Sequence, residues 1–170
     1  MNRRILLALF LTVGVFLVLS LGCGWLPTGA PVDMRVKDFT LPLLGGGEVH
    51  LSTYLGKPVI LVFFTPSCSH CWNEAPVLEA VYQRYKDRGL VVLGVGYIGK
   101  STEEALKHFV AENRLTYPVA IDTQETQVVR LYNVSWVPHN VFFDRRGKIV
   151  HEVRHELSEK DLEVYLKDIL

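Results

Sequence analysis

Two cysteines, Cys68 and Cys71, stand between an apolar run and a segment with helical periodicity. The run, residues 58–64, is continuous, as in a strand buried on both faces. Apolar side chains then recur at helical spacing through residues 71–86. The thiol pair therefore sits at a strand-to-helix junction, where it can close as a disulfide and reopen.

A structural staple is a poor explanation of this pair. A bridge between residues three apart closes a very small loop, so it removes little entropy from the unfolded chain. The only other cysteine is Cys23, in the N-terminal segment. The spacing thus favours a redox centre over a disulfide framework.

The N-terminal segment reads as an export signal. Arg3 and Arg4 precede an uncharged apolar stretch that runs to Leu21. The basic residues should stay in the cytoplasm, so the rest of the chain would lie on the extracytoplasmic side of the cell membrane. We expect a signal peptide or membrane anchor over residues 1–22 and a tether over residues 23–35.

Cys23 ends a segment, residues 19–23, that resembles a bacterial lipoprotein box. It departs from that pattern at Ser20 and Leu21. Lipidation of Cys23, an uncleaved anchor and release after cleavage all remain open, and so does a stray thiol in a leader.

The charge balance argues against a nucleic-acid-binding protein, and the length indicates a single domain. The chain carries 18 basic and 18 acidic residues, which leaves no basic footprint for nucleic acid. Its 170 residues are enough for about one domain with an apolar core.

Strands and helices alternate through residues 36–170, which predicts an α/β fold. The pattern indicates a mixed β-sheet with helices on both faces and an N-terminal hairpin extension. The predicted elements are a hairpin (39–41 and 48–51 around 45–47), strands 58–64, 90–95, 118–121, 140–144 and 148–153, and helices 71–86 (ended by Gly89), 101–113 (opened by a Ser101–Glu104 capping box), 124–132, and one capped by Ser158.

These features together resemble the thioredoxin fold, and more narrowly the membrane-tethered ResA/TlpA-type proteins of the bacterial cell envelope. That group is related to the AhpC/TSA peroxiredoxin-like proteins. The resemblance covers residues 36–170 and implies a thiol–disulfide oxidoreductase without a cofactor or metal. It rests on the redox pair Cys68 and Cys71, the acid Glu74, the helix proline Pro76, and Pro138, which follows Val137 and matches the family's cis-proline.

The resemblance also implies roles for these residues. Cys68 would be the nucleophile, because a helix N-terminus favours its thiolate. Cys71 would resolve the mixed disulfide, and Glu74, on the same helix face, would hold or accept the Cys71 proton. Val137 and Pro138 would leave backbone free to pair with a substrate peptide.

Departures from the family pattern concern the substrate surface and the redox potential. Ser67 replaces the usual tryptophan before the first cysteine, and Trp72 and Trp136 could supply replacement apolar area or simply pack. His70 would tune the pair toward oxidation, whereas Glu74 is typical of reducing members, so the direction of electron flow stays open. His139 could contact a substrate or be an idle neighbour.

The expected partners are exported proteins with cysteine pairs and, for a reductant, a membrane electron donor of the CcdA/DsbD type. Cytochrome c maturation and thiol reduction at metal sites are the candidate roles. Three rivals remain: a peroxiredoxin-like peroxidase, which Thr65 and Cys68 would fit but Leu61 would not; a copper-site assembly or metal carrier protein; and a binding module.

Overall fold

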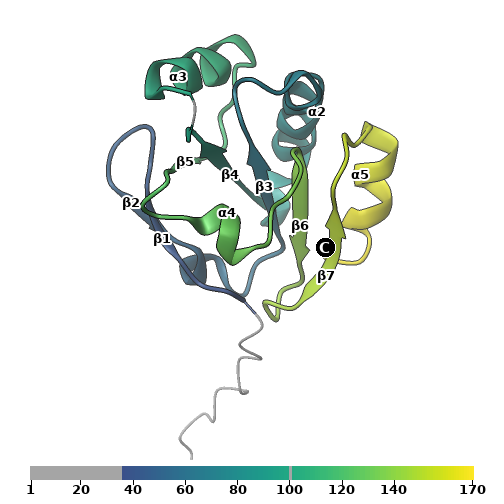
Figure 1. Ribbon diagram of the computed structural model, residues 1–170. Helices are drawn as coiled ribbons and strands as arrows, with labels where there is room; N and C mark the ends of the chain where they lie inside the picture. Colours follow the sequence, from purple (N-terminus) through teal and green to yellow (C-terminus); the bar gives the residue numbers. More distant parts are fainter. Residues whose placement is uncertain (1–35, 100) are drawn as a thin grey trace, which may run out of the picture. The chain divides into compact units, whose positions relative to one another are not determined.

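The structure is a computed structural model that describes residues 36–99 and 101–170 (Figure 1). The predicted leader, Cys23 and the tether lie outside the described residues. In chain order the elements are β1 (Thr40–Pro42), β2 (Glu48–His50), η1 (Leu51–Tyr54), β3 (Val59–Phe64), α2 (Ser69–Tyr85), η2 (Lys86–Arg88), β4 (Val91–Tyr97), α3 (Glu103–Glu112), β5 (Val119–Asp122), α4 (Val128–Leu131), β6 (His139–Phe143), β7 (Ile149–Val153) and α5 (Glu159–Leu166).

A five-stranded mixed sheet in the order β5-β4-β3-β6-β7 forms the centre of the fold. β3 pairs in parallel with β4 and antiparallel with β6, while β4 and β5 are parallel and β6 and β7 antiparallel. This confirms the predicted thioredoxin-like α/β fold.

The central strand β3 is buried at every residue, which explains its unbroken apolar sequence. Ile60, Val62 and Phe64 pack into one core cluster with α2, α3 and α5. The alternate residues of β3 face a second cluster, which is built with β1, β2, η1 and α4. Helices therefore cover both faces, as predicted, and β3 links the two clusters.

The predicted N-terminal hairpin is present as an antiparallel pair of short strands, β1 and β2. Gly46 and Gly47 adopt φ values of 95° and 80° in its turn, a region that glycine enters without steric cost. The hairpin is fastened to the central sheet, because Leu44 N–H donates to Val119 C=O at 2.9 Å. It is also held by the Tyr132 hydroxyl, which donates to Lys37 C=O at 2.7 Å.

Two helix starts differ from their predictions. α2 begins at Ser69 rather than residue 71, with Cys68 as its N-cap. α3 is capped by Thr102, whose hydroxyl accepts from Ala105 N–H, so the expected capping box of Ser101 and Glu104 is wrong. By contrast, Ser158 forms a complete capping box with Asp161 at the start of α5.

The predicted helix over residues 124–132 is too long, since only Val128–Leu131 is α-helical. The buried side chain of Asp122 is the physical reason. Its two carboxylate oxygens accept the N–H groups of Val128 and Val129, at 3.0 and 2.8 Å, and so fix where the helix begins. Gln127, just before it, has a positive φ of 54°.

The end of α2 also differs slightly. The α-helix stops at Tyr85, a 3₁₀ turn follows, and Gly89 then adopts the left-handed conformation with φ of 92°.

Among the helices of the described chain, none has the length and apolar character that crossing a bilayer would require.

Candidate active site

Cys68 lies at the junction between β3 and α2, where it is the N-cap residue of α2. Its Sγ accepts a hydrogen bond from Cys71 N–H at 3.2 Å. The thiol lies 3.5 Å from the carbonyl oxygen of Val137, to which it can donate. Cys68 is partly exposed, and both it and Cys71 are free thiols. Cys68 is therefore the sulfur that another molecule can reach.

Cys71 lies one helical turn deeper, with 2% of its surface exposed. Burial raises the pKa of its thiol strongly, and the neighbouring Cys68 and Glu74 raise it further. Cys71 thus stays protonated near neutral pH unless a nearby group takes its proton.

Glu74 is buried on the same side of α2, with 1% of its surface exposed. Burial raises the pKa of this carboxyl group to about 7, although two hydrogen bonds to it act in the opposite direction. Its Oε1 accepts from Asn140 Nδ2 and from Leu157 N–H, each at 2.9 Å. Glu74 is therefore not an exposed, solvated residue of the helix surface.

A small cavity lies beside Cys71 and Glu74. Its volume is about 10 Å³, close to the space that one water molecule requires. Tyr117 also lines it, and burial together with the charge of Glu74 raises the pKa of its hydroxyl. The cavity thus places a thiol, a carboxyl group and a phenol around one enclosed volume.

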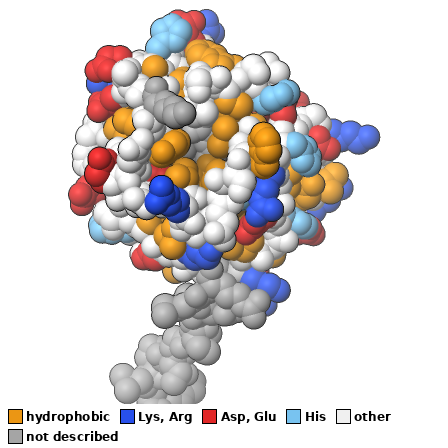
Figure 2. All heavy atoms as spheres, in the orientation of Figure 1, with side chains coloured by type: hydrophobic (Ala, Val, Ile, Leu, Met, Phe, Trp, Pro, Cys, Tyr) orange, Lys and Arg blue, Asp and Glu red, His pale blue; other side chains and the backbone are white. Residues whose placement is uncertain are grey.

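The loop before β6 faces Cys68. The Val137–Pro138 peptide bond is cis, as the resemblance predicts. Trp136 is 74% exposed, and Figure 2 shows hydrophobic side chains gathered on the face of the molecule that carries α4. Among the described residues, the main-chain groups of Trp136 and Val137 make no backbone–backbone hydrogen bond. An extended peptide could therefore pair with this segment.

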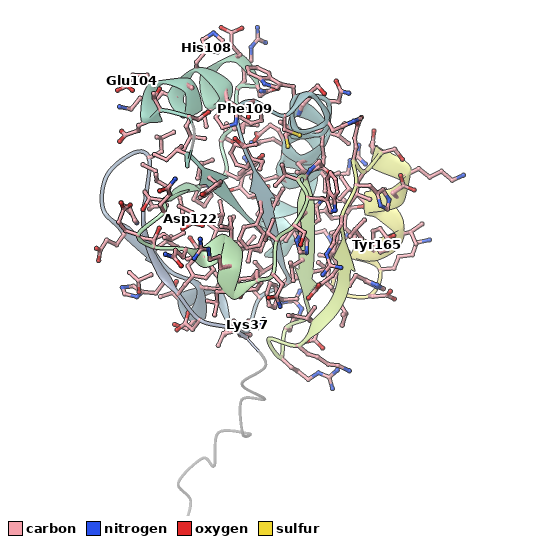
Figure 3. All side chains as sticks on the ribbon, in the orientation of Figure 1. Lys37, Glu104, His108, Phe109, Asp122 and Tyr165 are labelled. Carbon is pink, nitrogen blue, oxygen red and sulfur yellow. The ribbon has the colours of Figure 1, made fainter. Side chains whose placement is uncertain are left out.

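His70 and Trp72 both have partners other than the two cysteines. His70 Nδ1 lies 2.8 Å from Glu156 Oε2, at the surface. The indole N–H of Trp72 donates to Pro66 C=O at 2.8 Å, and its ring packs on Phe109, which reaches toward α2 from α3 (Figure 3). Packing thus accounts for Trp72, while Trp136 remains exposed.

Burial of His139 favours an idle neighbour, the second of its two interpretations. Its side chain is completely buried, 5.8 Å from the Phe63 ring between ring centroids. Burial lowers the pKa of this imidazole, which is consistent with a neutral side chain packed under the loop.

Sequence reasoning missed three groups at this site: Asn140, the N–H of Leu157, and Glu156, which also accepts from Asn73 at 3.3 Å. Asn140 carried a signal, because it is a polar residue in a strand that is otherwise mostly apolar. The other two lie in an irregular loop after β7 and have no comparable signal. Within residues 36–99 and 101–170, no three His, Cys, Asp or Glu side chains are grouped to hold a metal ion.

Comparison with known proteins shows the family of the chain. Residues 32–152 match the AhpC/TSA family. The thiol–disulfide oxidoreductase ResA of Geobacillus kaustophilus is 31% identical over 169 residues, which cover 99% of this chain and 94% of ResA. ResA of Bacillus cereus is 29% identical over 166 residues, covering 98% and 94%.

Solved structures give the same result. A secreted disulfide oxidoreductase of Mycobacterium tuberculosis, homologous to DsbE, has a TM-score of 0.69 and 26% identity, covering 76% of this chain and 95% of its own. The thioredoxin domain of a Bacteroides vulgatus thiol–disulfide oxidoreductase has a TM-score of 0.67 and 29% identity, covering 78% and 94%. The chain belongs to the AhpC/TSA family and, within it, to the ResA-type thiol–disulfide oxidoreductases.

Proposed function

We propose that Cys68 and Cys71 form the redox pair that exchanges disulfides with exported proteins. The supporting observation is the position of Cys68, partly exposed at the α2 N-terminus with Cys71 N–H at 3.2 Å from its sulfur. A helix N-terminus and a hydrogen bond to sulfur both favour the thiolate, which is the nucleophile in exchange.

The reaction has two displacement steps. The Cys68 thiolate attacks one sulfur of a substrate disulfide, forms a mixed disulfide and releases the other substrate sulfur as a thiolate. The Cys71 thiolate then attacks Cys68 Sγ, forms the Cys68–Cys71 disulfide and releases the reduced substrate. Run in reverse, the same steps oxidise a substrate dithiol, and the relative potentials decide the direction.

Glu74 serves the second step by accepting the Cys71 proton. The pKa of its carboxyl group, about 7, allows both protonation states near neutral pH. Its place beside the cavity that Cys71 also lines supports this role. After exchange, the proton on Glu74 passes to solvent, because Cys71 is then held in the disulfide.

The substrate peptide would bind along Trp136, Val137 and Pro138. Trp136 and Val137 make no backbone–backbone hydrogen bond within the part of the chain that the structure describes, so this loop would accept an extended segment. Trp136, 74% exposed, would contact its apolar side chains. Because the Val137 carbonyl lies 3.5 Å from Cys68 Sγ, a peptide bound to this loop would have its sulfur beside the nucleophile.

The site of action would be the extracytoplasmic side of the cell membrane, to which residues 1–22 or a lipid on Cys23 would tether the enzyme. As a reductant, it would take electrons from a membrane donor of the CcdA/DsbD type. Its substrates would be exported proteins whose cysteine pairs must be reduced before haem or metal is attached. The reaction itself uses no cofactor.

A Cys71→Ser variant in the native host tests the exchange chemistry. It should accumulate mixed disulfides through Cys68, and mass spectrometry would identify the partners. The matched control, Cys68→Ser, should accumulate none through Cys71. Cys71→Ser cells without adducts, while Cys68 stays free, would count against the proposal.

Two further measurements separate the alternatives. An equilibrium with glutathione gives the potential of the pair and hence the direction of electron flow. Consumption of hydrogen peroxide at a rate comparable to disulfide exchange would instead favour a peroxidase.

A further inference from the structure

Asn140 is a buried polar residue in the middle of the sheet. It belongs to β6, opposite Val62 of β3 and Val153 of β7. Its side chain is fully buried, and among the described residues its Oδ1 atom has no hydrogen-bond partner. An unpaired buried acceptor destabilises the folded protein, because it has lost its hydrogen bonds to water. An apolar side chain would avoid this cost, so the amide calls for a functional explanation.

The other end of the amide has a single, well-defined partner. Asn140 Nδ2 donates to Glu74 Oε1 at 2.9 Å, across a sequence separation of 66 residues. The N–H of Leu157 donates to the same oxygen at 2.9 Å. Because two donors occupy Oε1, Oε2 is the oxygen left to take a proton.

We propose that Asn140 is a positioning residue for disulfide exchange, which acts through Nδ2 to hold Glu74 as the acceptor of the Cys71 proton. This inference rests on the proposed function. Among the described residues, the hydrogen bond of Asn140 goes to Glu74 and not to either sulfur. It favours the ionised carboxylate of Glu74 inside a buried site, where burial alone would favour the neutral acid.

The chemistry makes the consequence specific. Only ionised Glu74 can accept the Cys71 proton, so resolution by Cys71 should accelerate as pH rises through the Glu74 titration, whose pKa is about 7. Losing the Nδ2 donor raises the pKa of Glu74 further. The resolution step should then need a higher pH, while attack by Cys68 should be unaffected.

The test uses the full chain with Cys23→Ala in every sample and an aromatic disulfide that releases one coloured thiolate per displacement. The first release reports attack by Cys68, and the second reports resolution by Cys71. In Asn140→Val the pH midpoint of the second release should move up by about one unit, which lowers the rate at pH 7 about fivefold, because Glu74 is half ionised at pH 7 in the wild type and about one-tenth ionised in the variant. Threonine has the size of valine but carries a hydroxyl donor. In Asn140→Thr the midpoint should therefore lie between those of Asn140→Val and wild type.

Two comparisons make the result decisive. The control is Asn73→Ala. Asn73 lies beside Glu74 on α2, but its amide donates to Glu156, so its loss should leave the midpoint unchanged. In a Glu74→Gln background the step near pH 7 should disappear, and Asn140→Val should add nothing. Should Asn140→Val not fold, the ¹³C carboxyl titration of Glu74 in Asn140→Thr and wild type replaces it, with a higher pKa expected in the variant.

The outcomes distinguish this inference from the proposed function. A wild-type midpoint in Asn140→Val, together with loss of the step near pH 7 in Glu74→Gln, overturns the role of Asn140 alone. A wild type that releases no second thiolate, or a Glu74→Gln profile identical to wild type, overturns the proposed mechanism and this inference with it.

Discussion

Glu74 shows how one residue links catalysis to stability. Its carboxyl group has an ordinary pKa of 4.5, and burial raises this pKa to about 7 in the folded protein. Between these values the folded state binds more protons than the unfolded state, so stability falls as pH rises. The loss of stability from ionising buried Glu74 is absent below about pH 4.5 and complete above about pH 7.

We therefore predict that Glu74→Gln stabilises the reduced protein at pH 8 relative to pH 4.5. The difference between variant and wild type should grow by up to about 3 kcal/mol over this range, because each pKa unit corresponds to about 1.4 kcal/mol. Urea denaturation of both proteins at several pH values measures it. A difference that does not change with pH would mean that Glu74 ionises as freely in the folded state as in the unfolded chain.

At the scale of elements, helix starts depend on single side chains. Thr102 Oγ1 accepts from Ala105 N–H at 3.2 Å, one turn into α3. We predict that Thr102→Ala lowers the free energy of unfolding by about 1 kcal/mol, as the loss of an N-cap usually does. Ser101→Ala, one position earlier, is the matched control and should change stability little. Equal losses in both variants would indicate that Ser101 shares the capping role.

The same elements show what sequence could and could not predict. Periodicity located the strands and helices, because burial on one or two faces sets the spacing of apolar residues. It misplaced the start of α3 and the length of α4, because Thr102 and Asp122 decide these by hydrogen bonds that spacing does not reveal. Local competition of this kind makes element ends the least predictable part of a fold.

The candidate site divides in the same way. Cys68, Cys71 and Glu74 occupy consecutive turns around the start of α2, so their spacing alone predicted that they would lie together. The groups that hold Glu74 come from far along the chain, with Asn140 and Leu157 separated from it by 66 and 83 residues. No local pattern predicts such contacts, which depend on how β6 and the loop after β7 pack against α2.

On the scale of the whole molecule, β3 joins two cores. Its alternate residues face α2, α3 and α5 on one side, and the N-terminal hairpin and α4 on the other. Residues 36–170 lie within one compact unit. The hairpin should therefore unfold together with the sheet rather than separately, although it extends the thioredoxin-like part.

Substitutions on the two sides of this shared core test that cooperativity. Leu41 of β1 and Leu61 of β3 are both completely buried in the same cluster. Replacing either by alanine should cost about 2–5 kcal/mol in a single transition that far-UV circular dichroism and tryptophan fluorescence report at the same urea concentration. Val164→Ala, at a half-exposed position of α5, should change stability little. If Leu41→Ala instead produced an early, separate transition and left the main one in place, the hairpin would be an independent unit, and the stability of the active site would not depend on it.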